Sequence, residues 1–183
     1  MTTINGKFYP IETTYLNLQC NTILTLPDSI GNLVNLQELD LFGNYLSTLP
    51  DTIGNLTNLT HLNLGFNNLK SLPDTIGNLT NLKHLNLYHN QLKSLPYTIG
   101  NLTNLLELSL ANQYIQFLPE SMANLTKLTS LYLRNNRLKT IPRMPNTRNI
   151  DDFDVSNDDG NDWSLDIELM GKTEIEIKNI VFG

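Results

Sequence analysis

Residues 36–59 read LQELDLFGNYLSTLPDTIGNLTNL, and this stretch decides the fold. Its apolar residues follow the spacing L-x-x-L-x-L-x-x-N-x-L-x-x-L-P, and the same spacing returns every 23 residues, so that six units run in register from residue 13 to residue 142. Self-similarity at a fixed period of this length is typical of a repeat architecture in which each unit is one structural element of a longer stack. The asparagine position of the six units holds Asn21, Asn44, Asn67, Asn90, Gln113 and Asn136.

Each unit predicts one short strand and one return segment. In Leu39-x-Leu41 the apolar residues alternate, which places both leucines on one face of a strand. One such strand cannot bury its leucines alone, whereas stacked copies form a continuous core. Pro50 favours a turn or a first helical position, and Ile53 and Leu56 then point back towards the core. Because the return side is bulkier than the strand side, we expect the stack to curve.

This pattern resembles the leucine-rich repeat family over residues 13–142, and the segment from Leu49 to Leu59 is similar to the 23-residue Ras-group class. The resemblance implies an α/β repeat solenoid. Its expected form is a curved, right-handed superhelix with a parallel sheet on the concave side and short helices or 3-10 turns on the convex side. It also implies that the concave sheet binds proteins, and it associates the class with small-GTPase signalling.

The asparagine column predicts a structural role for its side chains. Asn44, Asn67 and Asn90 lie where the chain leaves each strand and turns inward, so backbone groups there lack partners in the sheet. A buried asparagine side chain can satisfy both a donor and an acceptor at such a place. Gln113 departs from the column by one methylene, and we expect the fifth unit to be the least regular.

Both ends of the array predict caps. Residues 1–12 contain Asn5-Gly6 between Ile4 and Phe8, which favours a hairpin covering the leucines of the first strand. We expect residues 143–183 to form a degenerate seventh repeat, with Phe153 in the strand position, followed by an acidic β-hairpin that seals the last repeat. In that hairpin, alternating apolar residues such as Leu165 and Ile167 would form one face together with Trp163.

Composition and charge restrict the function further. Leucine and asparagine together make up 61 of the 183 residues, no apolar stretch is long enough to span a bilayer, and Cys20 is the single cysteine. The net charge is −6, with −8 on residues 150–183, and the pI near 4.9 argues against nucleic-acid binding. The N-terminus has no signal-peptide pattern, so we expect a cytoplasmic protein, monomeric and without membrane contact.

The outward positions of the strands are the predicted binding surface. Aromatic residues and histidines gather there, and such side chains bury large areas at low entropic cost when a partner binds. All three histidines of the sequence fall on these positions. The candidate partner-binding residues on this concave face are Tyr15, Glu38, Asp40, Phe42, His61, Phe66, His84, Tyr88, His89, Glu107, Tyr132 and Arg134.

A metal site is the alternative for one row of this surface. Glu38, His61, His84 and Glu107 stand at equivalent positions of neighbouring strands, and imidazoles with a carboxylate can hold zinc. A straight row disfavours the site, because tetrahedral ligands must converge on one point. The sequence predicts no metal and no other cofactor.

Enzyme signatures are missing from the sequence. It contains neither a glycine-rich phosphate loop nor a nucleophile elbow, and Cys20 has no histidine in its own repeat. We therefore expect a non-catalytic protein-interaction module with an adaptor or recognition role. Two other interpretations stay open, namely a microbial or viral mimic of host leucine-rich repeat signalling proteins and an orphan product without a partner.

Overall fold

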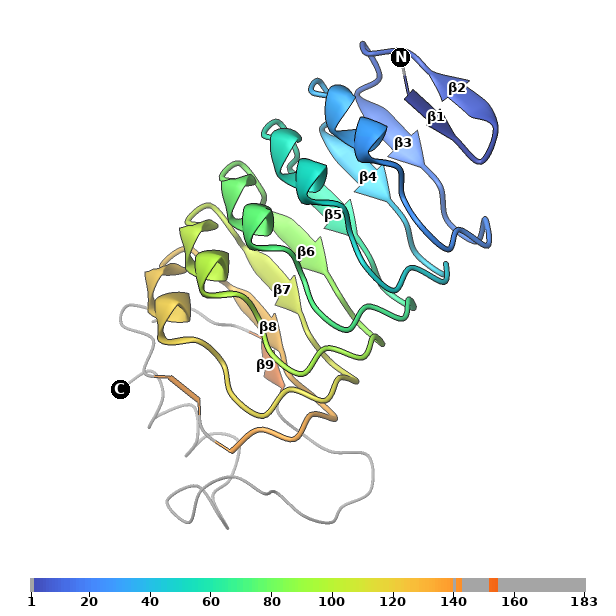
Figure 1. The fold of residues 1–183 in the computed structure, drawn as a ribbon. Helices are drawn as coiled ribbons and strands as arrows, with labels where there is room; N and C mark the ends of the chain where they lie inside the picture. The colour runs from blue at the N-terminus through green and yellow to red at the C-terminus, as the bar shows by residue number, and fades with distance from the viewer. Residues whose placement is uncertain (1, 140, 143–151, 155–183) are drawn as a thin grey trace.

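The computed structural model describes residues 2–139, 141–142 and, for the backbone, 152–154. Seven strands form one parallel sheet in the order of the sequence (Figure 1). Each strand pairs with the next at the repeat distance, so that Leu39 lies opposite Leu62. The strands are β3 (Tyr15–Asn17), β4 (Glu38–Asp40), β5 (His61–Asn63), β6 (His84–Asn86), β7 (Glu107–Ser109), β8 (Ser130–Tyr132) and β9 (Asp152–Asp154).

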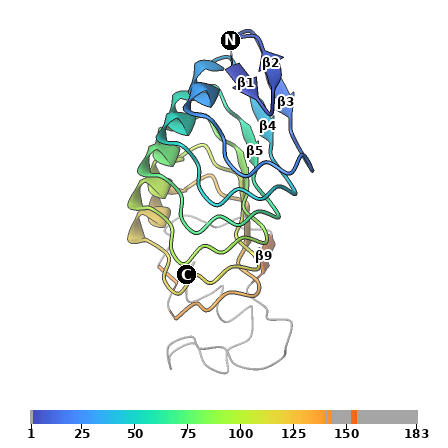
Figure 2. The same ribbon diagram turned by 45° about the vertical axis from the view of Figure 1, so that its right-hand side comes forward.

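Short 3-10 turns cover the opposite side of the stack. Every one of them follows a proline whose φ and ψ are extended, such as Pro50 at −69° and 149°, so the fixed proline ring sets where the turn begins. Figure 2 shows the turns as one layer and the strands as the other. The turns are η1 (Asp28–Asn32), η2 (Asp51–Asn55), η3 (Asp74–Asn78), η4 (Tyr97–Asn101) and η5 (Glu120–Asn124).

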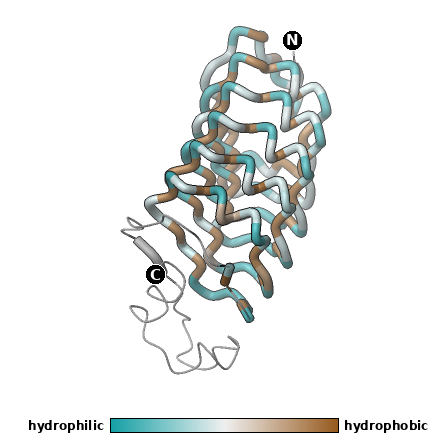
Figure 3. The backbone as a smooth tube through the Cα atoms, turned by 90° about the vertical axis from the view of Figure 1, so that its left-hand side faces the viewer, coloured by the Kyte–Doolittle hydropathy of each residue, from teal (hydrophilic) through white to brown (hydrophobic). Residues whose placement is uncertain are grey.

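The core lies between these two layers. The strand leucines and the turn isoleucines form one buried cluster, in which Leu62 is 1% exposed and Ile76 is fully buried. In Figure 3 the apolar positions recur at corresponding places of successive coils. The predicted fold class, a curved repeat solenoid, is confirmed, and the convex elements of the described residues are 3-10 turns rather than α-helices. Within the described residues, no helix combines the length and apolar character needed to cross a bilayer.

Glycines on the convex side allow the turns to stack closely. A Cβ added to Gly77 would lie 2.5 Å from the carbonyl oxygen of Thr98 in the next turn, and one added to Gly54 would lie equally near the carbonyl oxygen of Thr75. Ala123 occupies this position in η5, the last 3-10 turn of the described residues. Close approach of neighbouring coils therefore explains why the column is glycine wherever another turn follows.

The asparagine column is buried and joins neighbouring repeats. The Asn67 amide donates to the carbonyls of Leu41 and Leu64 at 3.0 and 3.1 Å, and its oxygen accepts from the Leu46 N–H at 3.0 Å. Asn44, Asn90 and Asn136 make the equivalent bonds. The predicted role of this column is confirmed for these four residues.

Two members of the column differ. Asn21 is exposed and donates to the Gln19 carbonyl. It lies in the first coil, so there is no preceding repeat whose backbone groups it could bond. Gln113 accepts from Leu92 and donates to Leu87, but among the described residues it makes no bond to the Leu110 carbonyl, three residues before it. The backbone pairing of the fifth repeat keeps the common register, with Leu110 donating to Tyr132. The irregularity expected there is seen in this side-chain hydrogen bond, while the strand register is unchanged.

A hairpin covers the N-terminal end of the stack. β1 (Thr2–Ile4) and β2 (Lys7–Tyr9) pair antiparallel around Asn5 and Gly6, both with positive φ, as the sequence predicts. Ile4 is 2% exposed and belongs to the core cluster. The hairpin forms a separate sheet and contacts η1, where the Thr2 hydroxyl donates to the Ser29 carbonyl. It covers the core from the turn side rather than by lying on the first strand.

At the C-terminal end, β9 continues the sheet. It pairs with β8 and places Phe153 opposite Leu131, the register that the 22-residue spacing predicts. Residues 155–183, which include Trp163 and the predicted acidic β-hairpin, lie outside the described residues.

Candidate partner-binding face

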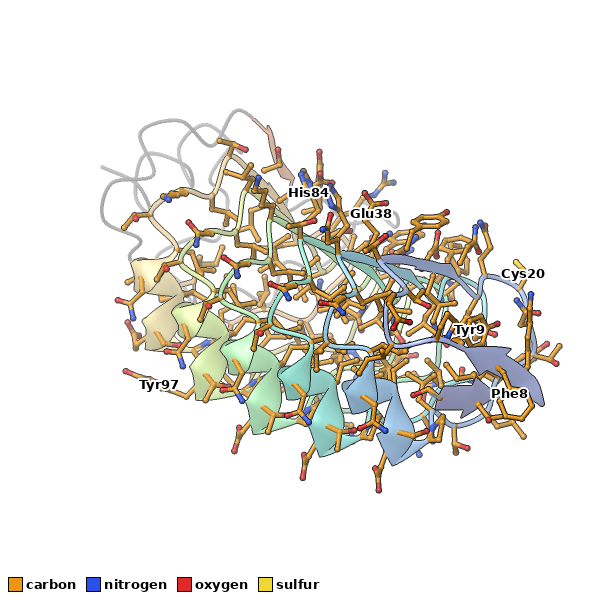
Figure 4. All side chains as sticks on the ribbon, turned by 90° about the horizontal axis from the view of Figure 1, so that it is seen from above. Phe8, Tyr9, Cys20, Glu38, His84 and Tyr97 are labelled. Atoms are coloured by element: carbon orange, nitrogen blue, oxygen red, sulfur yellow. The ribbon has the colours of Figure 1, made fainter. Side chains whose placement is uncertain are left out.

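The strands and the turns that follow them present two groups of outward side chains on the concave face. Figure 4 shows Glu38 and His84 on the sheet side of the molecule, whereas Tyr97 projects from the turn side. We define the histidine row as Glu38, His61, His84 and Glu107, which are paired across β4 to β7. All four side chains keep between 39% and 50% of their surface exposed. The sequence therefore placed this row correctly on the open face.

The two histidines of this row are stacked. The rings of His61 and His84 have centroids 4.5 Å apart and planes within 8° of parallel. His84 Nδ1 lies 3.1 Å from a carboxylate oxygen of Glu107, and His61 Nδ1 lies 4.0 Å from one of Glu38.

This geometry argues against the metal alternative. An ion bound to imidazole lies about 2 Å from the nitrogen in the plane of the ring, and two parallel stacked rings cannot share such a point. In the described part of the chain, no three histidine, cysteine, aspartate or glutamate side chains are placed to hold a metal ion.

A second group, the aromatic cluster, consists of Phe42, Phe66, Tyr88 and His89 and lies just beyond the ends of β4 to β6. Phe66 is its centre, with Phe42 and Tyr88 edge-on at 5.1 Å each and His89 stacked at 4.6 Å. The Phe66 ring is 41% exposed, and Phe42 and Tyr88 are half-buried. The four rings form a contiguous apolar patch that the columns of the sequence predicted only as separate residues.

The backbone beneath the aromatic cluster is unusual. Phe66 and His89 have φ of 52° and 56°, in the left-handed region that disfavours large side chains. The same position holds Gly43, Asn112 and Asn135 in other repeats, all with positive φ. Residues held in this region cost free energy and gather at sites with a function. An aromatic ring in this place has a cost that a glycine or an asparagine avoids.

Asp40 has a structural role that the sequence analysis missed. Its carboxylate accepts a hydrogen bond from the backbone N–H of Phe42 at 2.9 Å. Asn63 and Asn86 accept in the same way from Gly65 and Tyr88, at 3.2 and 2.9 Å. Aspartate or asparagine bonded to an N–H two residues later is a recognised turn motif, and its recurrence at one repeat position was the available signal. These side chains hold the start of the turn that carries the aromatic cluster.

The remaining candidates lie at the two ends of the face. Tyr15 on β3 is exposed, and its hydroxyl accepts from the Asn17 amide at 3.3 Å. Tyr132 on β8 is half-buried and Arg134 is exposed. Ala111 and Asn112 follow β7, so these two positions carry no ring that would extend the aromatic cluster towards Tyr132 and Arg134. Ten of the candidates thus lie on or just after β3 to β7, and Tyr132 and Arg134 lie on or just after the neighbouring β8.

A pocket of about 250 Å³ opens on this face and is lined in part by Glu38, His61 and His84 of the histidine row. We call it the concave pocket. Its walls come from four neighbouring strands, with strand leucines at its base. The lining residues are Tyr15, Glu38, Leu39, Asp40, His61, Leu62, Asn63, His84 and Asn86.

The sequence matches the family description "Leucine-rich repeat region" over residues 11–91 and 73–165, which together span most of the chain. The chain belongs to the leucine-rich repeat family. No curated protein sequence matches it significantly.

Solved leucine-rich repeat structures are similar to the chain. A leucine-rich repeat protein of Leptospira interrogans is 44% identical over 70% of this chain and 33% of its own, with a TM-score of 0.68. The ectodomain of the Arabidopsis thaliana receptor kinase GASSHO1/SCHENGEN3, in complex with CASPARIAN STRIP INTEGRITY FACTOR 2, is 37% identical over 66% of this chain and 15% of its own, with a TM-score of 0.61. PEPR1–AtPEP1 is 34% identical over 66% of this chain and 18% of its own, also with a TM-score of 0.61. This chain thus spans a third or less of their length.

The leucine-rich repeat coil also carries exposed aromatic residues on its return segments, outside the concave face. Arg137 lies over the Tyr114 ring at 4.8 Å, and Lys139 lies over the Phe117 ring at 5.6 Å. These cations interact with the ring faces that would otherwise be available to a partner. The rings against Phe66 are aromatic or imidazole rings, and among the described residues no cation lies over it, so the aromatic cluster is the better candidate for contact with a protein.

Proposed function

We propose that this leucine-rich repeat chain is a non-catalytic interaction module that binds a protein partner on the concave face of its sheet. The observation that carries the proposal is the aromatic cluster around Phe66. Four rings are packed on rigid turns and open to solvent, and interface hot spots are enriched in aromatic side chains of this kind. A preformed cluster also reduces the entropy lost on binding.

The similar structures support a protein ligand. One of them is GASSHO1/SCHENGEN3 in complex with CASPARIAN STRIP INTEGRITY FACTOR 2, and another is PEPR1–AtPEP1. We extend protein binding, but not the identity of those ligands, to this chain. Its 23-residue period also leads us to place it in the Ras-group-like class. We propose in addition that it has an adaptor or recognition role and acts as a cytoplasmic monomer.

The absence of catalysis is part of the proposal. Cys20 is exposed and lies against Gly43 in the first two repeats, whereas the three histidines lie on β5, β6 and the turn after β6. A thiol–imidazole pair would need the two groups within hydrogen-bond reach. The histidine row pairs its imidazoles with carboxylates and with each other instead.

Affinity capture from cell lysate tests the proposal. The double variant Phe42→Ala with Tyr88→Ala removes two rings on either side of Phe66, and we expect it to lose the partner that the wild-type chain retains. Phe117→Ala, which removes an exposed ring from the return segments, is the matched control and should retain the partner. Equal capture by the double variant and the wild type would exclude the concave face.

A further inference from the structure

The concave pocket is rich in hydrogen-bond acceptors. It contains the carboxylates of Glu38 and Asp40 and the imidazoles of His61 and His84, and none of its lining residues is a lysine or an arginine. Asp40 uses one oxygen for the Phe42 N–H, which leaves the other free to accept. Lys83, which directly precedes His84 in the sequence, lines a different pocket together with Asn81 and Asn104.

Hydrogen bonding determines which ring nitrogens are acceptors. The Glu107 carboxylate can only accept, so Nδ1 of His84 carries the proton. The neutral His84 ring therefore presents Nε2 as an acceptor. The Thr60 hydroxyl contacts both the Gln37 carbonyl, at 3.1 Å, and His61 Nδ1, at 2.9 Å, and it can donate to only one of them.

We infer that the concave pocket binds an arginine side chain of the protein partner, which makes it a specificity site of the proposed interaction face. A guanidinium group offers several N–H donors in a planar fork, which suits two carboxylates and the His84 Nε2 atom. His84 covers one face of the His61 ring, so the other face is turned towards β4 and the exposed Tyr15, where a planar cation can stack. This inference rests on the proposed function, because it names the chemistry that the partner brings.

The first test uses two peptides and the full chain. Acetyl-Gly-Arg-Gly-amide is titrated while the ring protons of His61 and His84 and the methyl groups of Leu39 and Leu62 are followed by NMR. The citrulline peptide, which keeps the shape of arginine without its charge, is the control. We expect saturable shifts with arginine and an affinity at least about tenfold lower with citrulline, because charge-assisted hydrogen bonds are lost. Equal affinities would overturn the inference.

Matched variants locate the site. Glu38→Gln removes a carboxylate from the pocket, and we expect it to weaken arginine binding by about tenfold. Glu120→Gln removes the same charge from η5 on the turn side, away from the pocket, and should leave arginine binding unchanged. An equal effect of both glutamate variants would contradict the assignment.

One further variant separates this inference from the proposed function. Phe66→Ala lies outside the concave pocket, and we expect it to bind the arginine peptide like the wild type while losing the protein partner. Loss of peptide binding with an unchanged unfolding temperature would show that the aromatic cluster and the pocket are a single site, against the inference. Partner capture that survives Glu38→Gln unchanged would likewise refute the pocket while leaving the aromatic face intact.

Discussion

The rings of Phe66 and His89 lie parallel, 4.6 Å apart, although the backbone of both residues is left-handed. The two residues occupy the same position in consecutive repeats, and the stacking of the coils therefore places one ring beside the other. The position favours glycine or asparagine on steric grounds, and Gly43 and Asn112 occupy it in other repeats. The aromatic cluster therefore forms at a cost to the stability of the coil.

That cost can be measured by two substitutions at one position. Phe66→Asn and Phe66→Leu both remove the ring, but asparagine tolerates positive φ and leucine does not. We expect the asparagine variant to be more stable than the leucine variant by about 1 kcal/mol, from urea unfolding. The converse change Asn112→Leu should lower stability by a similar amount. A leucine variant as stable as the asparagine variant would mean that the backbone relaxes at no cost.

Asn67 should contribute much more to stability than Asn58. Asn67→Ala leaves the buried Leu46 N–H without its partner, which costs about 1–3 kcal/mol of unfolding free energy. Asn58 is exposed and donates a single bond to the Val34 carbonyl at 2.8 Å, which water can replace in Asn58→Ala. Chemical denaturation of the two variants provides the comparison. Equal losses would remove the argument for the buried column.

Gln113 offers a stabilising substitution. Gln113→Asn should restore the hydrogen bond to the Leu110 carbonyl that Asn67 and Asn90 make to their own equivalents, and we expect a gain of about 0.5–1.5 kcal/mol. Asn90→Gln is the reverse change and should lose a similar amount. Thermal unfolding of both variants tests the pair, and a destabilised Gln113→Asn would show that the fifth repeat has adapted to the longer side chain.

The glycine column on the convex side should not tolerate a methyl group. Gly77→Ala places a Cβ 2.5 Å from the Thr98 carbonyl oxygen, and overpacking of this kind costs about 1–3 kcal/mol. Ala123→Gly, at the corresponding place of η5, should cost only the added backbone entropy, about 0.5–1 kcal/mol. Differential scanning calorimetry of both variants would settle the difference, and a neutral Gly77→Ala would mean that the coils can separate freely.

Sequence spacing predicted what depends on periodicity. The strand leucines, the buried asparagines and the outward rows follow from a fixed repeat, because each position of one coil lies beside the same position of the next. The hairpin at Asn5-Gly6 also followed from local turn chemistry.

Two kinds of feature were not predicted. The hydrogen bond from the Phe42 N–H to Asp40 is local, and its recurrence along the repeats was a signal that the analysis did not use. The close approach at Gly77 depends on the distance between coils, because the turns are packed more tightly than a side chain allows. The histidine row was identified as exposed, but the stacking of His61 on His84 and the tautomer of His84 required the rotamers and the neighbouring Glu107.

The asparagine column also determines the order in which the coils can close during synthesis. Asn67 completes the turn of the coil before it, since it accepts from Leu46 and donates to Leu41, residues that leave the ribosome earlier. A growing chain therefore cannot close one coil until 21 further residues have been added to reach the next asparagine. At about 5–20 residues per second, each coil waits for a second or more with an open turn. Folding during synthesis lags one repeat behind translation, and a nascent chain exposes its unsatisfied backbone at the growing end.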